Sequence, residues 1–357
     1  MLNSRNTFLT ANDMRKKNRT LFYVFSGILI LQACSPSAPR FSPNPYASWS
    51  AEDPGLQKQS LSIPLPERWN ERAYPLDEIH QKTLTSINAI DGFKDVPEKS
   101  SQEEEFKKLL SEVRATLPDA VNRQFDEFVY GIYFVRKLGS TGLTGIIRDG
   151  KKPIGGIIFL DTDFLNRKAN DWASFKENTV FQEDANNTLH LRIEEEDKDT
   201  ISAALSFILL HEFGHILAVL GNHAPDYSLK ERDFRSFPFF QGIWIGENES
   251  EFDSGFFQER KTIRFYGDKK IRLAPEGLNL YRKLKNTPFV TLYSSTNADD
   301  TFADSYVSYV HVILQKKPYE IYLLSQGKKK QIFKNGITEE NGRRPREFFD
   351  KIFKVLP

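Results

Sequence analysis

The chain has 357 residues, of which 27% are charged and 13% are aromatic, and its formal net charge is +1. This composition is that of a globular protein rather than a disordered one. The near-zero net charge argues against a nucleic-acid-binding protein, which would carry a basic surplus.

The first 33 residues predict an export signal. The basic segment MRKKNRT precedes the apolar segment LFYVFSGILILQA, which is too short to span a bilayer comfortably. The apolar segment ends in LQAC, which resembles the lipobox of bacterial lipoproteins, with Cys34 as the residue to be lipidated. An uncleaved membrane anchor is the alternative, and Met14 is an alternative start. We therefore expect a lipid-anchored protein of the bacterial cell envelope, in the outer membrane or facing the periplasm.

The remainder predicts a tether followed by one folded domain. Residues 34–60 are rich in Pro and Ser, which is typical of an extended tether, whereas 61–357 has the composition of a folded domain. Spacing and residue type then predict, in order, a helix (103–117), strands (128–135, 155–161 and 187–193), an apolar helix from Asp199 or Thr200 to Gly221, an irregular aromatic-rich insertion (about 224–290), a helix (299–314), a hairpin (320–333) and a closing helix (346–353). The expected fold class is α+β, with the apolar helix packed on a small mixed sheet.

The apolar helix contains the sequence HEFGH, whose polar side chains would be costly to bury unsatisfied. His211 and His215 lie one turn apart on one helix face, as two zinc ligands require. Glu212 is displaced by one position and can reach a metal-bound water without binding the metal, which suits a general base. The pattern predicts one Zn²⁺ per chain. The alternatives are a core helix with incidental histidines and an intramembrane protease, for which no partner segment of spanning length exists.

The third zinc ligand is not determined by this motif. His223 and Asp226 follow the helix and are interpreted as loop residues. A thermolysin-like arrangement would recruit Glu249 or Glu251, and this alternative stays open.

The segment at 293–304 carries a more specific pattern. It follows the spacing Y-x-x-T-N-x-x-E-x-F-A-E, with Asp in place of both glutamates, and so resembles gluzincins like the anthrax lethal factor protease domain. The resemblance implies a zincin-like metallopeptidase fold, Asp300 as the third zinc ligand and Tyr293 as a phenol that assists catalysis. Because Asp is shorter than Glu, the second helix would have to pack closer to the metal. One turn further on, Asp304 is expected to orient a histidine ligand through its other ring nitrogen.

The resemblance implies a membrane-anchored zinc metallopeptidase that hydrolyses peptide bonds of a protein or peptide substrate with metal-activated water. The strand at 187–193 is a candidate for pairing with an extended substrate. His80, His190 and His311 are interpreted as ordinary surface or core residues. Two alternatives stay open: a catalytically impaired metalloprotease-like lipoprotein that binds a partner, which the Asp-for-Glu changes favour, and a zinc hydrolase acting on cell-wall amide bonds.

Overall fold

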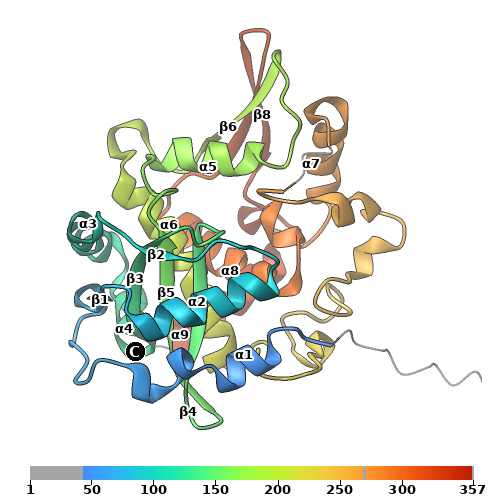
Figure 1. The fold of residues 1–357 in the computed structure, drawn as a ribbon. Helices are drawn as coiled ribbons and strands as arrows, with labels where there is room; N and C mark the ends of the chain where they lie inside the picture. Colours follow the sequence, from blue (N-terminus) through green and yellow to red (C-terminus); the bar gives the residue numbers. More distant parts are fainter. Residues whose placement is uncertain (1–42, 268–270, 356–357) are drawn as a thin grey trace, which may run out of the picture. The chain divides into compact units, whose positions relative to one another are not determined.

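The structure, a computed structural model, describes residues 43–267 and 271–355 (Figure 1). These residues belong to one compact unit of mixed α and β structure, as predicted. The expected export signal, Met14 and Cys34 lie outside the described residues.

The main sheet has five strands and is mixed. Its members are β1 (Ala73–Tyr74), β2 (Glu98–Lys99), β3 (Val129–Arg136), β4 (Gly142–Asp149) and β5 (Lys152–Asp161). The order is β1-β3-β5-β4, with β2 pairing with β3; β1, β3 and β5 are parallel, and β4 runs antiparallel to β5 at the edge. The predicted strands at 128–135 and 155–161 correspond to β3 and β5 and are confirmed, whereas β1, β2 and β4 were not predicted.

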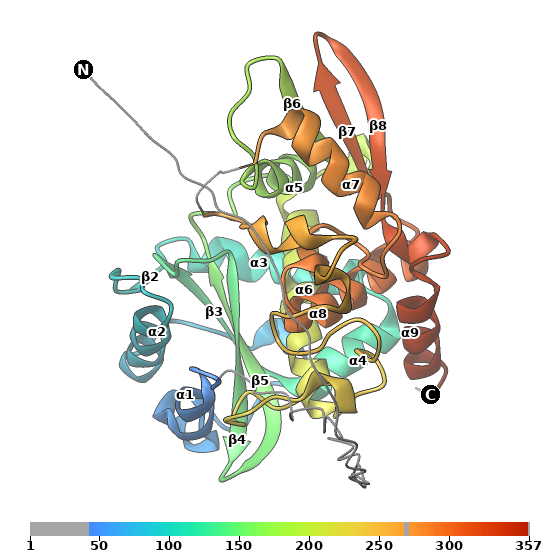
Figure 2. The same ribbon diagram turned by 90° about the vertical axis from the view of Figure 1, so that its right-hand side faces the viewer.

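The sheet separates two apolar cores, because successive side chains of a strand point to opposite faces. Ile157 and Phe159 face a smaller core, which includes residues of α2 (Glu78–Ile90). Ile158 and Leu160 face the larger core, which is built around α6 (Ile201–Leu220). Figure 2 shows α2 and α1 (Ala47–Glu52) on one side of the sheet, with α6 and α8 (Ala298–Ser308) on the other.

Helix α6 has the bounds that the sequence predicts. The Thr200 side chain accepts a hydrogen bond from the backbone N–H of Ala203, and Gly221 is the C-cap. Most residues between these caps are apolar, and 83% of the most apolar stretch is buried within the fold. Among the described residues, α6 alone is long and apolar enough to cross a membrane, and its burial identifies it as the core helix.

The remaining helices surround this core. They are α3 (Glu103–Thr116), α4 (Asp119–Phe128), α5 (Ala169–Asn178), α7 (Leu278–Leu284) and α9 (Arg343–Val355). Helices α3 and α9 confirm the predictions for 103–117 and 346–353. The predicted helix at 299–314 consists of α8 and a π-helical continuation (Tyr309–Leu314), and the insertion around 224–290 is mostly loops and short 3₁₀ turns with α7 near its end.

A second, three-stranded antiparallel sheet has the order β6 (Asn187–Arg192), β7 (Glu320–Ser325) and β8 (Lys328–Lys334). Strands β7 and β8 are the predicted hairpin at 320–333. Strand β6 confirms the alternating strand at 187–193.

The prediction of an extended tether up to residue 60 is wrong for residues 44–60, which belong to the fold. The Asn44 side chain donates hydrogen bonds to backbone carbonyls of the loop after α6. The backbone carbonyl of Ser50 accepts from the buried guanidinium of Arg148, and Leu56 is fully buried. The Pro and Ser content of this segment obscured the anchoring residues between them.

Candidate metal centre

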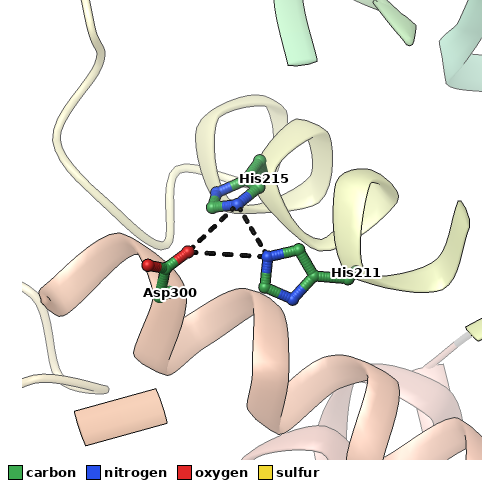
Figure 3. A group of neighbouring side chains, drawn as sticks. All are labelled: His211, His215 and Asp300. Atoms are coloured by element: carbon green, nitrogen blue, oxygen red, sulfur yellow. Dashed lines mark hydrogen bonds and ion pairs between the residues drawn. The ribbon is translucent and has the colours of Figure 1, made fainter. Parts of the chain in front are cut away.

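Helix α6 positions the two histidines of the HEFGH sequence. They come from successive turns of one face, and their Nε2 atoms lie 3.3 Å apart (Figure 3). The His211 side chain is buried and that of His215 is nearly so. Both imidazoles therefore present a nitrogen to one point at the surface of α6.

Asp300, in the first turn of α8, completes a triangle with these histidines. Its Oδ1 atom lies 3.5 Å from Nε2 of His211 and 3.7 Å from Nε2 of His215 (Figure 3). The helices approach closely enough because Gly214 faces Ala303: a Cβ on the glycine would lie 2.6 Å from the Cα of Ala303. This contact supplies the close packing that an aspartate ligand requires.

The triangle fits a zinc ion. Bonds of 2.0–2.2 Å in tetrahedral geometry place ligand atoms roughly 3.3 Å apart. The three observed separations, 3.3, 3.5 and 3.7 Å, are close to this value. Within the described ranges, His211, His215 and Asp300 form the one group of His, Cys, Asp or Glu side chains that is compact enough to hold a metal ion.

The outer ring nitrogens of both histidines also have partners. Asp304, one turn beyond Asp300, lies with its Oδ1 3.1 Å from Nδ1 of His211. The Tyr227 hydroxyl lies 3.0 Å from Nδ1 of His215. Such contacts determine the ring orientation and tautomer of a metal-binding histidine. The Asp304 contact corresponds to the sequence-based expectation, whereas Tyr227 was missed because nothing in its local sequence distinguishes it.

Tyr227 is held in turn by Arg232, a buried residue of the same loop. The guanidinium of Arg232 lies 4.5 Å from the centroid of the Tyr227 ring. It donates two hydrogen bonds, of 2.6 and 2.7 Å, to Asp299, which precedes Asp300 in α8. The loop after α6 thus connects the environment of His215 to the helix that carries the third candidate ligand.

The electrostatics of the cluster favour a cation between the three side chains. Burial lowers the pKa of His211, but its contacts with Asp300 and Asp304 outweigh this effect and raise that pKa to about 9. Burial and the nearby charge of His211 lower the pKa of His215. Without metal, the cluster therefore carries a proton on His211, which a metal ion would displace on binding.

Glu212 lines the same cleft as the triangle, and its carboxylate contacts the edge strand β4. Its Oε2 atom accepts a hydrogen bond of 2.8 Å from the Thr144 hydroxyl, and its Oε1 atom lies beside Gly142. The carboxylate is outside the compact His-His-Asp group. Its position beside the candidate ligands suits proton transfer rather than metal binding.

Tyr293 lies next to the same cluster. Its ring centroid is 5.4 Å from that of His211, and the Lys176 ammonium lies 3.6 Å from the Tyr293 ring centroid. Burial, followed by the charge of Asp300, raises the Tyr293 pKa well above its usual value. The phenol therefore remains protonated at neutral pH and is available as a hydrogen-bond donor.

These side chains line a cleft of ≈ 350 Å³. One wall contains His211, Glu212 and His215. A second wall is formed by the start of β4 (142–144), and a third wall is formed by Tyr46 and Trp49 of the N-terminal segment. A second hollow of ≈ 670 Å³ shares Tyr293, Asn297 and Asp300 with it. The N-terminal segment, predicted as a tether, thus contributes directly to the cleft.

The other sequence candidates lie elsewhere. Glu249 and Glu251 do not belong to the compact group. Asp226 forms an ion pair with Arg148, and His223 stacks on an aromatic side chain of α8. These observations agree with the interpretation of His223 and Asp226 as loop residues.

The three remaining histidines lie outside the cluster. His80 and His311 are buried with their own hydrogen-bond partners, and His190 belongs to β6. None of the β6 residues lines the cleft, whereas residues 142–144 of β4 do. Comparison of the chain with family models, with curated proteins and with solved structures gives no match.

Proposed function

We propose that this chain is a zinc-dependent metallopeptidase with a zincin-like fold, which hydrolyses peptide bonds with a water molecule activated at His211, His215 and Asp300. One observation carries the proposal: three candidate ligand atoms at tetrahedral spacing share a cleft with the carboxylate of Glu212, which lies outside their group. A structural metal site would need a fourth protein ligand, whereas a site with three ligands keeps a position for water.

A zinc ion bound here would act as a Lewis acid and lower the pKa of a coordinated water toward about 7. Glu212 accepts a proton from the attacking water and delivers it to the departing amine, as a general base and then a general acid. The Tyr293 phenol donates a hydrogen bond to the carbonyl oxygen as its negative charge develops. Asp304 and Tyr227 keep the two imidazoles in the orientation that presents both Nε2 atoms.

The edge strand supports an extended peptide as substrate. Residues 142–144 of β4 are half-buried, line the cleft and pair on one side with β5. In the described part of the chain, the only bridge on the opposite side of β4 joins Gln57 to Arg148, beyond the cleft. An extended chain can add to such an edge through its backbone, which gives recognition that tolerates different side chains.

The lipobox-like sequence supports a lipid anchor at Cys34, which would hold the enzyme at a membrane of the cell envelope. Because the described fold begins near Asn44, about ten residues would separate the lipid from the domain. We propose that the substrate is a protein or peptide that reaches this surface.

Hydrolysis of a quenched-fluorescent peptide library by the zinc-loaded protein tests the proposal. Glu212→Gln should retain zinc and fold but lose about 10²–10⁴-fold in rate, because the amide cannot accept the proton. Glu249→Gln, outside the compact group, is the matched control and should retain activity. If the wild-type protein binds zinc but cleaves no peptide in the library, the peptidase proposal is wrong, and assays on cell-wall amides and for protein partners would separate its two alternatives.

A further inference from the structure

The Glu212 carboxylate is held by a residue from a different element. The Thr144 hydroxyl of β4 lies 2.8 Å from Oε2 of Glu212 and 2.9 Å from the backbone carbonyl of the same residue. Each distance suits a hydrogen bond donated by the hydroxyl. The hydroxyl has a single proton, which these two acceptors share, so Thr144 contacts both the side chain of Glu212 and the backbone from which it extends.

A second feature of β4 acts on the other carboxylate oxygen. A Cβ atom at Gly142 would lie 2.5 Å from Oε1 of Glu212 and 2.9 Å from its carboxyl carbon. Any other residue at this position would push the carboxylate away. Gly142 has no left-handed backbone conformation that would otherwise explain its identity.

We infer that β4 positions the general base: Thr144 holds one oxygen of the Glu212 carboxylate, and Gly142 leaves the space that the other oxygen occupies. The inference rests on the proposed function, since it assigns positioning residues to the proton-transfer step. A glutamate side chain has several rotatable bonds. Holding it in one rotamer before the reaction means that the loss of conformational entropy does not add to the activation free energy of proton transfer.

The arrangement links substrate binding to proton transfer. Residues 142–144 are also the part of the β4 edge that lines the cleft. The same strand would therefore align both the bound peptide and Glu212, the proposed general base for its scissile bond. Even a 1 Å displacement of a catalytic group can cost about 10²-fold in rate, so the two β4 residues are expected to affect turnover more than binding.

Three variants of the zinc-loaded protein test the inference. Thr144→Val keeps the shape of the side chain but removes its hydroxyl, and it should lower kcat about 10–100-fold while KM and zinc affinity stay unchanged. Thr144→Ser restores the donor and should recover most of the lost kcat. Gly142→Ala should lower kcat at least as much as Thr144→Val, because the new methyl group displaces the carboxylate.

Thr141→Val is the matched control. Thr141 immediately precedes β4 and contacts the Tyr266 hydroxyl rather than Glu212. Its substitution should leave kcat near the wild-type value. Crystal structures add a readout independent of activity: Glu212 should adopt one rotamer in the wild-type protein and in Thr144→Ser, but a displaced or multiple rotamer in Thr144→Val.

An unchanged kcat in Thr144→Val would overturn the inference, as would equal losses in Thr144→Val, Thr144→Ser and Thr141→Val. An unmoved Glu212 in the Thr144→Val crystal structure would also overturn it, whether or not the protein hydrolyses peptides. Failure of the proposed function looks different, because the wild-type protein itself would then be inactive.

Discussion

The Nδ1 atom of His211 lies 3.1 Å from Oδ1 of Asp304, which leaves Nε2 of the same ring facing Asp300 and His215. Asp304 is itself fixed, because the hydroxyl of Thr291 donates a hydrogen bond to its second carboxylate oxygen. Asp300 and Asp304 of α8 therefore have different positions: Asp300 faces the candidate metal position, and Asp304 contacts the far side of the His211 imidazole.

The two aspartates should differ in their effect on zinc binding. Asp300→Ala leaves two imidazoles, and zinc affinity should collapse. Asp304→Ala removes only the contact to Nδ1 of His211 and should lower zinc affinity by about 10–100-fold. Asp300→Glu should retain more affinity than Asp300→Ala, because it keeps a carboxylate ligand.

Titration of the metal-free variants with zinc against a competing chelator measures this order. Glu251→Ala is the control and should bind zinc like the wild-type protein. A loss of zinc in Glu251→Ala together with its retention in Asp300→Ala would replace the lethal-factor-like arrangement with a thermolysin-like one.

Tyr227 should prove to be part of the metal centre even though it contacts no metal. Tyr227→Phe keeps the ring beneath Arg232 but removes the hydroxyl that contacts Nδ1 of His215. Zinc affinity should fall by about 10–100-fold in the chelator assay. Tyr309→Phe, which removes a hydroxyl bound to Asp350, serves as the comparison. Equal affinities in the two variants would show that the Tyr227 hydroxyl has no influence on His215.

The N-terminal segment should contribute to stability. Leu56 is fully buried in the smaller core, so Leu56→Ala should lower the free energy of unfolding by about 2–5 kcal/mol. Substitution of the exposed neighbour Gln59 by Ala should change the free energy of unfolding by less than about 0.5 kcal/mol. Urea unfolding of a protein beginning at residue 43 measures both values. Similar stabilities for the two variants would restore the interpretation of residues 44–60 as a tether.

Glu177 should make stability depend on pH. Burial raises the pKa of this carboxyl to about 7, even though the Tyr281 hydroxyl donates a hydrogen bond to it. Between about pH 4.5 and pH 7 the carboxyl of Glu177 therefore keeps its proton in the folded protein but loses it in the unfolded chain. The free energy of unfolding consequently falls as the pH rises through this range. Glu177→Gln should remove this dependence and stabilise the protein at pH 8 by up to about 3 kcal/mol.

The free energies of unfolding of Glu177→Gln and of the exposed control Glu105→Gln, measured at pH 5 and pH 8, test whether stability changes with pH in the predicted direction. The stabilisation by Glu177→Gln should be larger at pH 8 than at pH 5. An equal effect at both values would mean that Glu177 does not titrate in this range.

The parts of the centre that depend on helical periodicity could be predicted from the sequence. His211 and His215 are one turn apart on any helix, as are Asp300 and Asp304. The caps of α6, Thr200 and Gly221, were equally visible because capping is a local interaction.

The contacts that support these residues could not be predicted, because they are set by packing between distant segments. Thr144 meets Glu212 only because β4 takes the edge position beside α6. Tyr227 belongs to an irregular loop whose course depends on Arg232 and on Asn44 from the N-terminal segment. That segment was itself misassigned, since its prolines indicated a tether while its few buried residues determine its place in the fold.

Anomalous diffraction at the zinc absorption edge, from crystals of the zinc-loaded protein, tests the central claim most directly. The account predicts one peak in the cleft, about 2.0–2.2 Å from Nε2 of His211, Nε2 of His215 and a carboxylate oxygen of Asp300. Glu212 should lie beside the peak without bonding to it. A cleft without a peak, or a peak whose third protein ligand is Glu249 or Glu251, would contradict the account.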